Sequence, residues 1–186
     1  SDTNAPELVI DNSTSPSNPS KGWSIAADMR NSGGANNWEM FVGVGSSSYP
    51  AISAGTDSVS VSGAPSILVG QISGGNGAGG SATQLFRVNG TQIGTATVAY
   101  HKDTGETYHA GAGDNATTYE LNGEIAEIIQ FNRALTTTEI QQVEGYLAEK
   151  YGITAASAWK SSNPYQSDVN GHARTNVVDK NITYMM

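Results

Sequence analysis

The stretch that decides the fold is residues 85–100, LFRVNGTQIGTATVAY. Its centre is Asn89-Gly90, which is the strongest short sequence signal for a two-residue turn between antiparallel strands. The apolar residues before the turn predict one strand, and the run from Ile93 to Tyr100 predicts its return partner. We therefore expect antiparallel hairpins to build the core.

The composition also favours strands over helices. Gly, Ser, Thr and Asn make up 40% of the 186 residues, whereas Leu, Ile, Val and Phe make up only 18%. So low an apolar share at a net charge of −8 is typical of disordered chains, but the regular spacing of the apolar residues argues against disorder. Val and Ile outnumber Leu by 24 to 6, which favours β structure and excludes an all-helical bundle.

Upstream of this hairpin, apolar residues alternate with polar ones in three runs. The first run covers 23–29, with Trp23, Ile25, Ala27 and Met29 on one face, and the second covers 38–44. A turn is expected at 31–34 between them. The third run centres on Val59 and Val61. Each run predicts a strand with one buried face.

Three segments nearer the hairpin and after it complete the pattern. Residues 66–72 are apolar on both faces, which predicts a central strand, and residues 73–83 are expected to form a Gly-rich loop. Glu124–Phe131 is the most apolar run of the chain and predicts a further strand. Short strands spaced about 8–12 residues apart are typical of a two-sheet sandwich.

One helix is predicted, over about 137–151. Thr136 and Glu139 fit a capping box, and Gly152 supplies a stop signal. The apolar residues between them recur at helical spacing: Ile140, Val143, Tyr146, Leu147 and Tyr151. Such a helix buries a single stripe, which we expect to pack on the outer face of the sandwich.

The chain is expected to hold one domain, at 23–168. Residues 1–22 predict an N-terminal arm or edge strand, in which only Leu8–Ile10 could pair, and residues 169–186 predict a C-terminal tail or arm. The first residue is Ser1, from which we expect either the removal of an initiator Met or the cleavage of a longer precursor.

Charge and composition exclude several classes of function. Nine basic residues against 17 acidic ones leave no basic stripe for nucleic acid. No apolar run approaches the about 20 residues that span a bilayer, so membrane insertion is not expected. The absence of cysteine excludes disulfides, thiol catalysis and thiolate metal sites.

Residues 122–153, NGEIAEIIQFNRALTTTEIQQVEGYLAEKYGI, resemble the C-terminal signature of laminin-G-like, concanavalin-A-like jelly-roll domains. Residues 85–91 are similar to that family's hairpin, and residues 162–165 (SNPY) to a segment that often follows its helix. The resemblance covers about residues 20–168. It implies an all-β, antiparallel two-sheet jelly-roll sandwich with one short C-terminal helix. Lectins, adhesion modules, glycan hydrolases and structural domains share this fold, so the function has to come from a site.

Glycan hydrolysis requires two carboxylates across one bond. Hydrolases of the resembled fold carry Glu-x-Asp-x-x-Glu on one strand, and this pattern is absent here. Glu124 and Glu127 are the nearest match, but their odd separation points them to opposite faces of a strand. A hydrolase is therefore the least favoured class.

Sugar binding and calcium binding are the more plausible chemistries. Sugars stack on exposed aromatic rings, for which Trp38, Tyr108 and Tyr119 are the candidates. Calcium takes carboxylate and carbonyl oxygens from loops, and Asp114 with Asn115 in the loop AGAGDNAT is its best candidate site. The alternative for Asp114-Asn115 is a structural Asx turn. His101 and His109 could face each other on a hairpin, without an evident third ligand.

The first functional hypothesis is a non-enzymatic surface recognition or decoration module. It would be a structural or accessory protein of an assembled particle such as a phage virion, on the head or associated with the tail. Its polar arms would contact other virion or surface proteins, and it would lie on the virion surface or outside the cell. A glycan ligand and a homo-oligomer are compatible with this role. The alternative is a carbohydrate-binding or adhesion domain of a larger exported bacterial protein.

Overall fold

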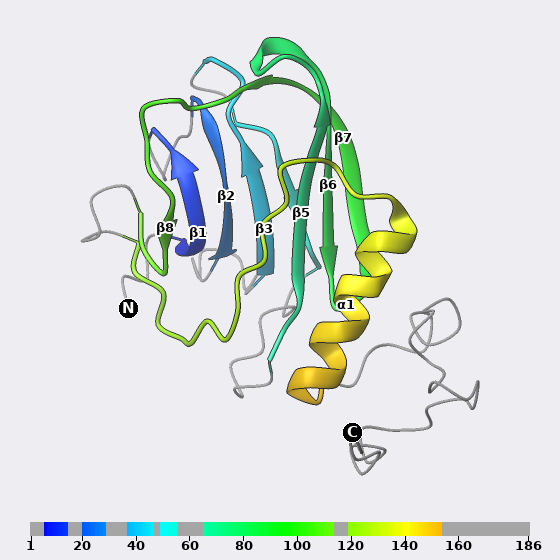
Figure 1. The fold of residues 1–186 in the computed structure, drawn as a ribbon. Coiled ribbons are helices and arrows are strands. Elements are labelled where there is room, and N and C mark those ends of the chain that lie inside the picture. Colours follow the sequence, from blue (N-terminus) through cyan, green and yellow to red (C-terminus); the bar gives the residue numbers. More distant parts are fainter. Residues whose placement is uncertain are drawn as a thin grey trace.

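The computed structural model describes residues 6–14, 20–28, 37–46, 49–55, 65–113 and 119–153. Eight strands form two antiparallel sheets, and one helix follows them (Figure 1). The first sheet has the order β4-β3-β2-β1-β8, with β1 at Glu7–Ser13, β2 at Gly22–Asp28, β3 at Asn37–Val42, β4 at Ala51–Ser53 and β8 at His109–Ala110. The second has the order β5-β6-β7, with β5 at Leu68–Gly74, β6 at Ala78–Val88 and β7 at Thr91–His101. The expectation of a predominantly β protein with two antiparallel sheets is confirmed.

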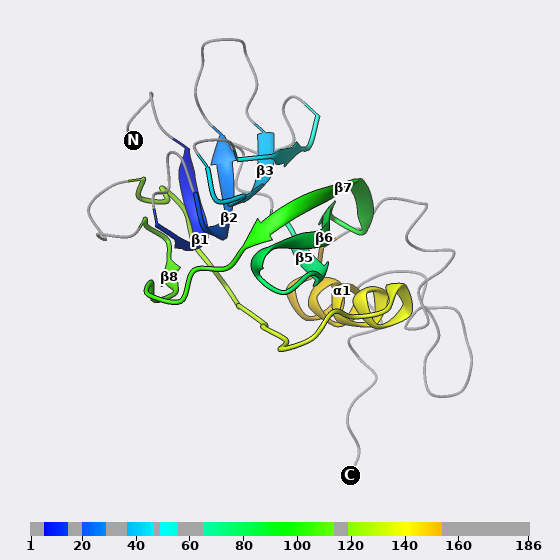
Figure 2. The same ribbon diagram turned by 90° about the horizontal axis from the view of Figure 1, so that it is seen from above.

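The main apolar core lies between the two sheets. Strands β2 and β3 contribute Ile25, Met40 and Val42, and strands β6 and β7 contribute Ala82, Phe86, Val88 and Val98. The alternation expected at 23–27 is present in β2, which places Trp23, Ile25 and Ala27 on the inner face. Seen from above, the helix lies on the other side of the second sheet from the first sheet (Figure 2).

The β6–β7 hairpin forms as predicted. Val88 pairs with Thr91, and the two residues between them, Asn89 and Gly90, have φ values of 49° and 80°. Two positive φ values define the turn type whose twist matches that of a hairpin. Asn89 also exchanges hydrogen bonds with Ile67, because its N–H donates to the Ile67 carbonyl and its Oδ1 accepts from the Ile67 N–H, both at 2.8 Å. The turn is thereby fixed to the chain just before β5.

Two predictions next to this hairpin are wrong. Strand β5 is an edge strand rather than a central one. It is apolar on both faces because Leu68 packs on the core between the sheets and Val69 packs on the helix. The predicted loop 73–83 is mostly strand, since only residues 75–77 separate β5 from β6. Asn76 closes this short turn, where its Oδ1 accepts the N–H groups of Ala78 and Gly80.

The N-terminal strand is longer and more central than predicted. Strand β1 covers Glu7–Ser13 and lies between β2 and β8 instead of at an edge. Its register with β2 shifts between Leu8 and Ile10, which breaks the simple alternation that a sequence reading relies on. Several expected features lie outside the described residues: Met29, the turn at 31–34, the run at Val59 and Val61, the segment 162–165 and the tail 169–186.

The helix α1 covers Thr137–Tyr151, as predicted. Both bonds of the capping box between Thr136 and Glu139 are present, and Gly152 ends the helix at a φ of 66°. Leu147 and Ala148 pack on Ile67 and Val69, which places the helix on the outer face of the second sheet. A bidentate ion pair between Arg87 and Glu144, with side chains 7% and 0% exposed, joins β6 to the helix. Within the described ranges, no helix has the length and apolar character that crossing a membrane requires.

The strand predicted at Glu124–Phe131 does not form. Residues 122–135, here called the strap, cross the gap between the two sheets in an extended conformation and pair with no described strand (Figure 1). At one end, the Asn122 N–H donates to Glu7 Oε2 of the first sheet at 3.1 Å. At the other end, the Leu135 N–H donates to Gln71 Oε1 of the second sheet at 2.7 Å. Because its ends are held by different sheets, the strap belongs to neither.

Candidate functional site

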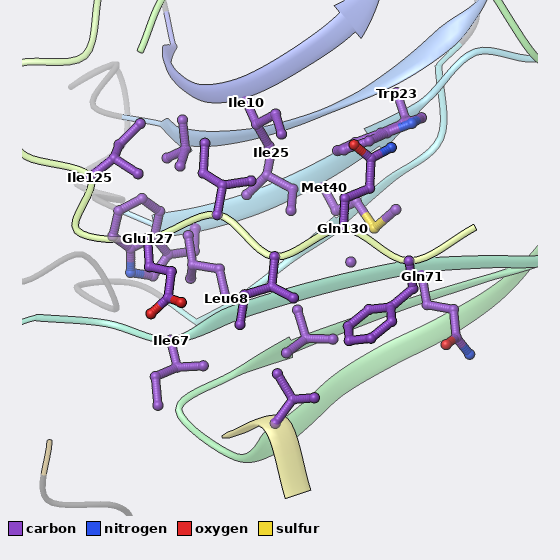
Figure 3. A pocket seen from close by; sticks show the side chains of 18 of the residues that line it. Ile10, Trp23, Ile25, Met40, Ile67, Leu68, Gln71, Ile125, Glu127 and Gln130 are labelled. Atoms are coloured by element: carbon purple, nitrogen blue, oxygen red, sulfur yellow. The ribbon is translucent and has the colours of Figure 1, made fainter. Parts of the chain in front are cut away.

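A cleft of about 1650 Å³ lies between the two sheets (Figure 3). The inner face of the first sheet forms one wall, with Trp23, Ile25 and Met40, and strand β5 forms the opposite wall. The strap passes along the cleft and contributes Ile125, Glu127 and Gln130 to its lining. The lining therefore mixes apolar and polar side chains, and clefts are where ligand sites usually lie.

Aromatic side chains gather at the end of the cleft where β2 begins and β7 ends. Tyr108 is 52% exposed, and its ring lies against that of Trp23 with the centroids 5.9 Å apart and a tilt of 56°. Tyr100 lines the same cleft, and burial raises its pKa to about 12, with smaller contributions from Tyr108 and Asp103. Its hydroxyl therefore stays protonated even at pH 10, where an ordinary tyrosine is half ionised, and it can donate a hydrogen bond. We call Trp23, Tyr100 and Tyr108 the aromatic mouth.

Two polar side chains accompany the aromatic mouth. Lys102 follows Tyr100 by two residues, and its backbone N–H donates to the Gly77 carbonyl at 2.8 Å. Its stem lies so close over Gly77 that a Cβ there would be 2.8 Å from Lys102 Cδ. Asn76 lines the cleft beside Gly77. The turn between β5 and β6 thus lies against Lys102, and both Lys102 and Asn76 line the same cleft as the three rings.

The imidazole of His101 fits into a socket that joins the two sheets at this end. A Cβ on either Gly45 or Gly79 would lie 2.6 Å from His101 Nε2. Gly45 follows β3 of the first sheet, and Gly79 belongs to β6 of the second. The backbone N–H of His101 also donates to the Gly43 carbonyl at 3.0 Å. The ring therefore requires two glycines, one from each sheet.

Three carboxylates also line the cleft, and two of them have structural partners. Glu7 accepts the Asn122 N–H, and Glu127 Oε2 accepts hydrogen bonds from Lys150 Nζ and the Tyr151 hydroxyl, both at 3.1 Å. The Tyr146 hydroxyl and Glu127 raise the pKa of the Lys150 ammonium. Glu124 is the exposed member of the three. Glu7 and Glu127 therefore tie the strap in place.

The structure brings only some of the predicted site residues together. Trp38 and Tyr108 line the same cleft. Trp38 pairs with Ala27, four residues along β2 from Trp23, which puts it about 13 Å from the aromatic mouth at a rise of about 3.3 Å per residue. Asp114 and Asn115, the expected calcium site, lie outside the described residues.

Tyr119, a predicted sugar-stacking residue, lies away from the aromatic mouth. Its carbonyl accepts the Leu8 N–H at 2.9 Å, which fixes the residue beside β1. Its side chain packs on the outer face of the first sheet, against the cluster of Leu8, Ala26 and Phe41. Tyr119 and the aromatic mouth are therefore on opposite faces of one sheet.

The histidine pair expected on one hairpin is also separated. His109 lies in β8 of the first sheet, where it pairs with Asp11, whereas His101 ends β7 of the second. In the part of the chain that the structure describes, no group of three His, Asp or Glu side chains could hold a metal ion.

Four residues of the candidate site were not among the predicted site residues: Trp23 and Tyr100 of the aromatic mouth, and Asn76 and Lys102 in the cleft. The alternation in β2 places Trp23 on the same face as Ile25, which suggests a core residue, and that inner face is the wall of the cleft. Tyr100 and Lys102 are two residues apart at the end of β7, so strand alternation places them on one side. This spacing is the sequence signal that could have indicated them as site residues. Asn76 came close to Lys102 only through the turn between β5 and β6.

Comparisons with protein-family models, with curated proteins and with solved structures find no significant match to this chain.

Proposed function

We propose that this protein is a non-enzymatic surface recognition module that binds a glycan at the aromatic mouth. The observation that carries the proposal is the Tyr108 ring, half exposed and supported from beneath by Trp23 at the opening of a cleft. Aromatic rings that are apolar on one face and open to water offer the C–H faces of a sugar a stacking surface. The Tyr100 hydroxyl, Asn76 and Lys102 supply hydrogen bonds for sugar hydroxyls.

A laminin-G-like jelly roll is the fold we propose for the sandwich. Two antiparallel sheets and a helix at Thr137–Tyr151 support it, because the resembling segment leads to a helix at this place. The proposed setting is the surface of an assembled particle such as a phage virion, with an exported bacterial protein as the alternative. Mass spectrometry of purified particles tests the setting, and finding the protein only as a free monomer would contradict it.

A glycan hydrolase is less well supported by the same cleft. Glu7 and Glu127 hold the strap through hydrogen bonds, so neither is placed as a free acid or nucleophile. General acid catalysis requires a carboxyl with access to the bond that breaks. We therefore expect Glu124→Gln to leave glycan binding unchanged. We also expect the native chain to release no reducing sugar from the glycans that it binds.

The test is a glycan array on the full chain, followed by titration calorimetry of the glycan that binds. Tyr108→Ala should weaken binding about 5- to 13-fold, since one stacking contact is worth about 1–1.5 kcal/mol. Tyr146→Ala is the matched control, because Tyr146 is 45% exposed on the helix, away from the mouth. Equal binding by the Tyr108→Ala variant and the native chain would overturn the site.

The array is run with calcium and again with a chelator. Binding that is indifferent to the chelator supports the aromatic mouth. Binding lost with the chelator would instead assign recognition to a calcium site, for which Asp114 is the first residue to substitute. A chain that binds no glycan would contradict the proposed ligand and would favour a purely structural role on the particle.

A further inference from the structure

Four Asn-Gly pairs occur in the chain, and the structure describes three of them, at 76–77, 89–90 and 122–123. An asparagine that precedes glycine is prone to lose ammonia, because glycine has no side chain to shield its backbone nitrogen from the asparagine side chain. The reaction requires the side chain to turn onto that nitrogen. Whether a pair reacts in the folded protein therefore depends on what holds its asparagine.

Two of the three pairs are held by hydrogen bonds. Asn76 Oδ1 accepts the N–H groups of Ala78 and Gly80 at 2.9 and 3.1 Å. Asn89 Oδ1 accepts the Ile67 N–H, and the Asn89 N–H donates to the Ile67 carbonyl, both at 2.8 Å. In both pairs, these hydrogen bonds have to open before the side chain can reach the next backbone nitrogen.

The third pair, Asn122-Gly123, lies at the start of the strap, and both of its residues are exposed. Apart from the Asn122 N–H, which donates to Glu7 Oε2 at 3.1 Å, neither residue forms a hydrogen bond with another described residue. Asn76 is exposed as well, so exposure alone does not distinguish the two asparagines. The difference is that no hydrogen bond to a described residue holds the Asn122 side chain away from the Gly123 nitrogen.

We propose that Asn122 is a site of spontaneous modification, and that the modification releases one end of the strap. The Gly123 nitrogen attacks Asn122 Cγ, the bond from Cγ to Nδ2 breaks, and ammonia leaves with the proton of the Gly123 nitrogen. Water then opens the resulting five-membered imide at one of its two carbonyl carbons, which gives aspartate or isoaspartate. The net change is the uptake of one water and the loss of one ammonia, so no oxidant, reductant or enzyme is required.

Both products place a new carboxylate in the residue whose N–H binds Glu7. Glu7 is buried, and a second negative charge beside it repels its carboxylate, which weakens the hydrogen bond that ties the strap to the first sheet. Isoaspartate also lengthens the backbone by one carbon before Gly123, so the residues that follow are displaced. Asn122, Gly123 and Glu124 all line the cleft. The modification therefore alters the wall of the cleft at the end where the strap begins.

Peptide mapping by mass spectrometry, on the full chain aged at neutral pH, tests the reaction. Trypsin, which cleaves after Lys and Arg, places the three asparagines on three different peptides. The rate of each site in guanidinium chloride is the reference. In the folded chain, Asn76 and Asn89 should convert at least about tenfold more slowly than their references, since each has two hydrogen bonds to open, whereas Asn122 should stay close to its own. A folded chain in which Asn122 is slowed as much as Asn89 would overturn the proposal.

Gly123→Ala is the matched control for the attacking nitrogen. A Cβ at position 123 would lie 3.6 Å from Leu121 Cγ, which is an ordinary contact, so the variant should fold and keep the strap in place. Its methyl group shields the nitrogen, so the conversion of Asn122 should slow while Asn76 and Asn89 keep their rates. Unchanged conversion of Asn122 in this variant would contradict attack by the nitrogen of residue 123.

Amide hydrogen exchange, followed by NMR on the aged and the unaged chain, tests the release of the strap. The amide of residue 122 should exchange at least about tenfold faster in the isoaspartate form, because its hydrogen bond to the Glu7 carboxylate is lost. The Leu121 amide donates to the Gly111 carbonyl at 2.9 Å and is the internal reference, which should keep its rate. An isoaspartate form in which the amide of residue 122 exchanges at the unaged rate would show that the strap stays bound, which overturns the release.

Discussion

The β6–β7 hairpin and the strap are two β-prone stretches with opposite outcomes. In the hairpin, only the two turn residues Asn89 and Gly90 separate the two strands, so each strand finds its partner at once. The pairing extends from this turn to Ala78 and His101. The strap is at least as apolar, but its ends are bound to Glu7 and Gln71, which belong to different sheets. The comparison teaches that β propensity alone does not make a strand, because a strand also needs a free edge within reach.

The largest expected difference is in the energetic contribution of the two regions. Phe86 of β6 is fully buried, and Phe86→Ala should lower the free energy of unfolding by about 3–5 kcal/mol because it leaves a cavity in the core. Ile128 of the strap is 47% exposed, and Ile128→Ala should cost less than about 1 kcal/mol. Urea unfolding of both variants measures the difference. Similar losses in the two variants would show that the strap is packed as firmly as the hairpin.

The next expected difference is smaller: acid should remove stability from a contact that the strap makes with the helix. The Arg133 side chain of the strap binds Glu139 at 2.6 Å, and this hydrogen bond, with those from Thr136, lowers the pKa of Glu139 to about 2. The folded state therefore binds the proton less tightly than the unfolded state, whose carboxyl has an ordinary pKa of 4.5. The stability from this contact is present above pH 4.5 and is lost as the pH falls towards 2.

Unfolding of the native chain and of Glu139→Gln, measured at a series of pH values, checks this. The native chain should be the more stable of the two at neutral pH, and its advantage should disappear towards pH 2. Thr136→Ala should cost about 1 kcal/mol through the lost N-cap and should raise the pKa of Glu139. An advantage that does not change with pH would contradict the role of the Arg133 contact.

The smallest effect is spectroscopic and concerns the end of the hairpin. Tyr100 is the last residue but one of β7 and lines the cleft, and its pKa of about 12 makes it a late-titrating tyrosine. The unfolded chain ionises this phenol near pH 10 and the folded chain does not, so the folded state loses stability as the pH rises from 10 towards 12. Absorbance at 295 nm should show a late step that Tyr100→Phe removes and Tyr146→Phe keeps. If the late step remains in Tyr100→Phe, it comes from another tyrosine, and the Tyr100 hydroxyl is then exposed to water rather than buried.

Local signals explain what the sequence can predict of this fold. The hairpin, the alternation in β2 and β3, and the helix with its capping box all depend on residues within a few positions of each other, and the structure contains each of them. Except for the loop predicted at 73–83, which the structure replaces by a short turn at 75–77, the errors concern partners that are distant in the chain. The centrality of β1, the edge position of β5 and the strap depend on which strands meet, and periodicity carries no information about that.

The candidate site was less predictable for the same reason. Tyr108 was recognisable as an aromatic residue near a loop, but Trp23, its neighbour in space, is 85 positions earlier in the chain. Tyr119 has the same residue type and a similar setting in the sequence, yet it lies on the opposite face of the first sheet. A face can be assigned from alternation only inside a strand, and both tyrosines lie in connecting segments.

The socket around His101 ties together three positions that no local pattern relates. Each glycine admits the ring because it has no Cβ, and Gly45 and Gly79 have φ values of 76° and 89°, at which other residues are strained. A larger residue at position 45 or 79 would fit only beside a smaller one at position 101. Across any set of sequences that keep this fold, those three positions are therefore expected to change together, and their joint variation would report the contact between the two sheets without a structure.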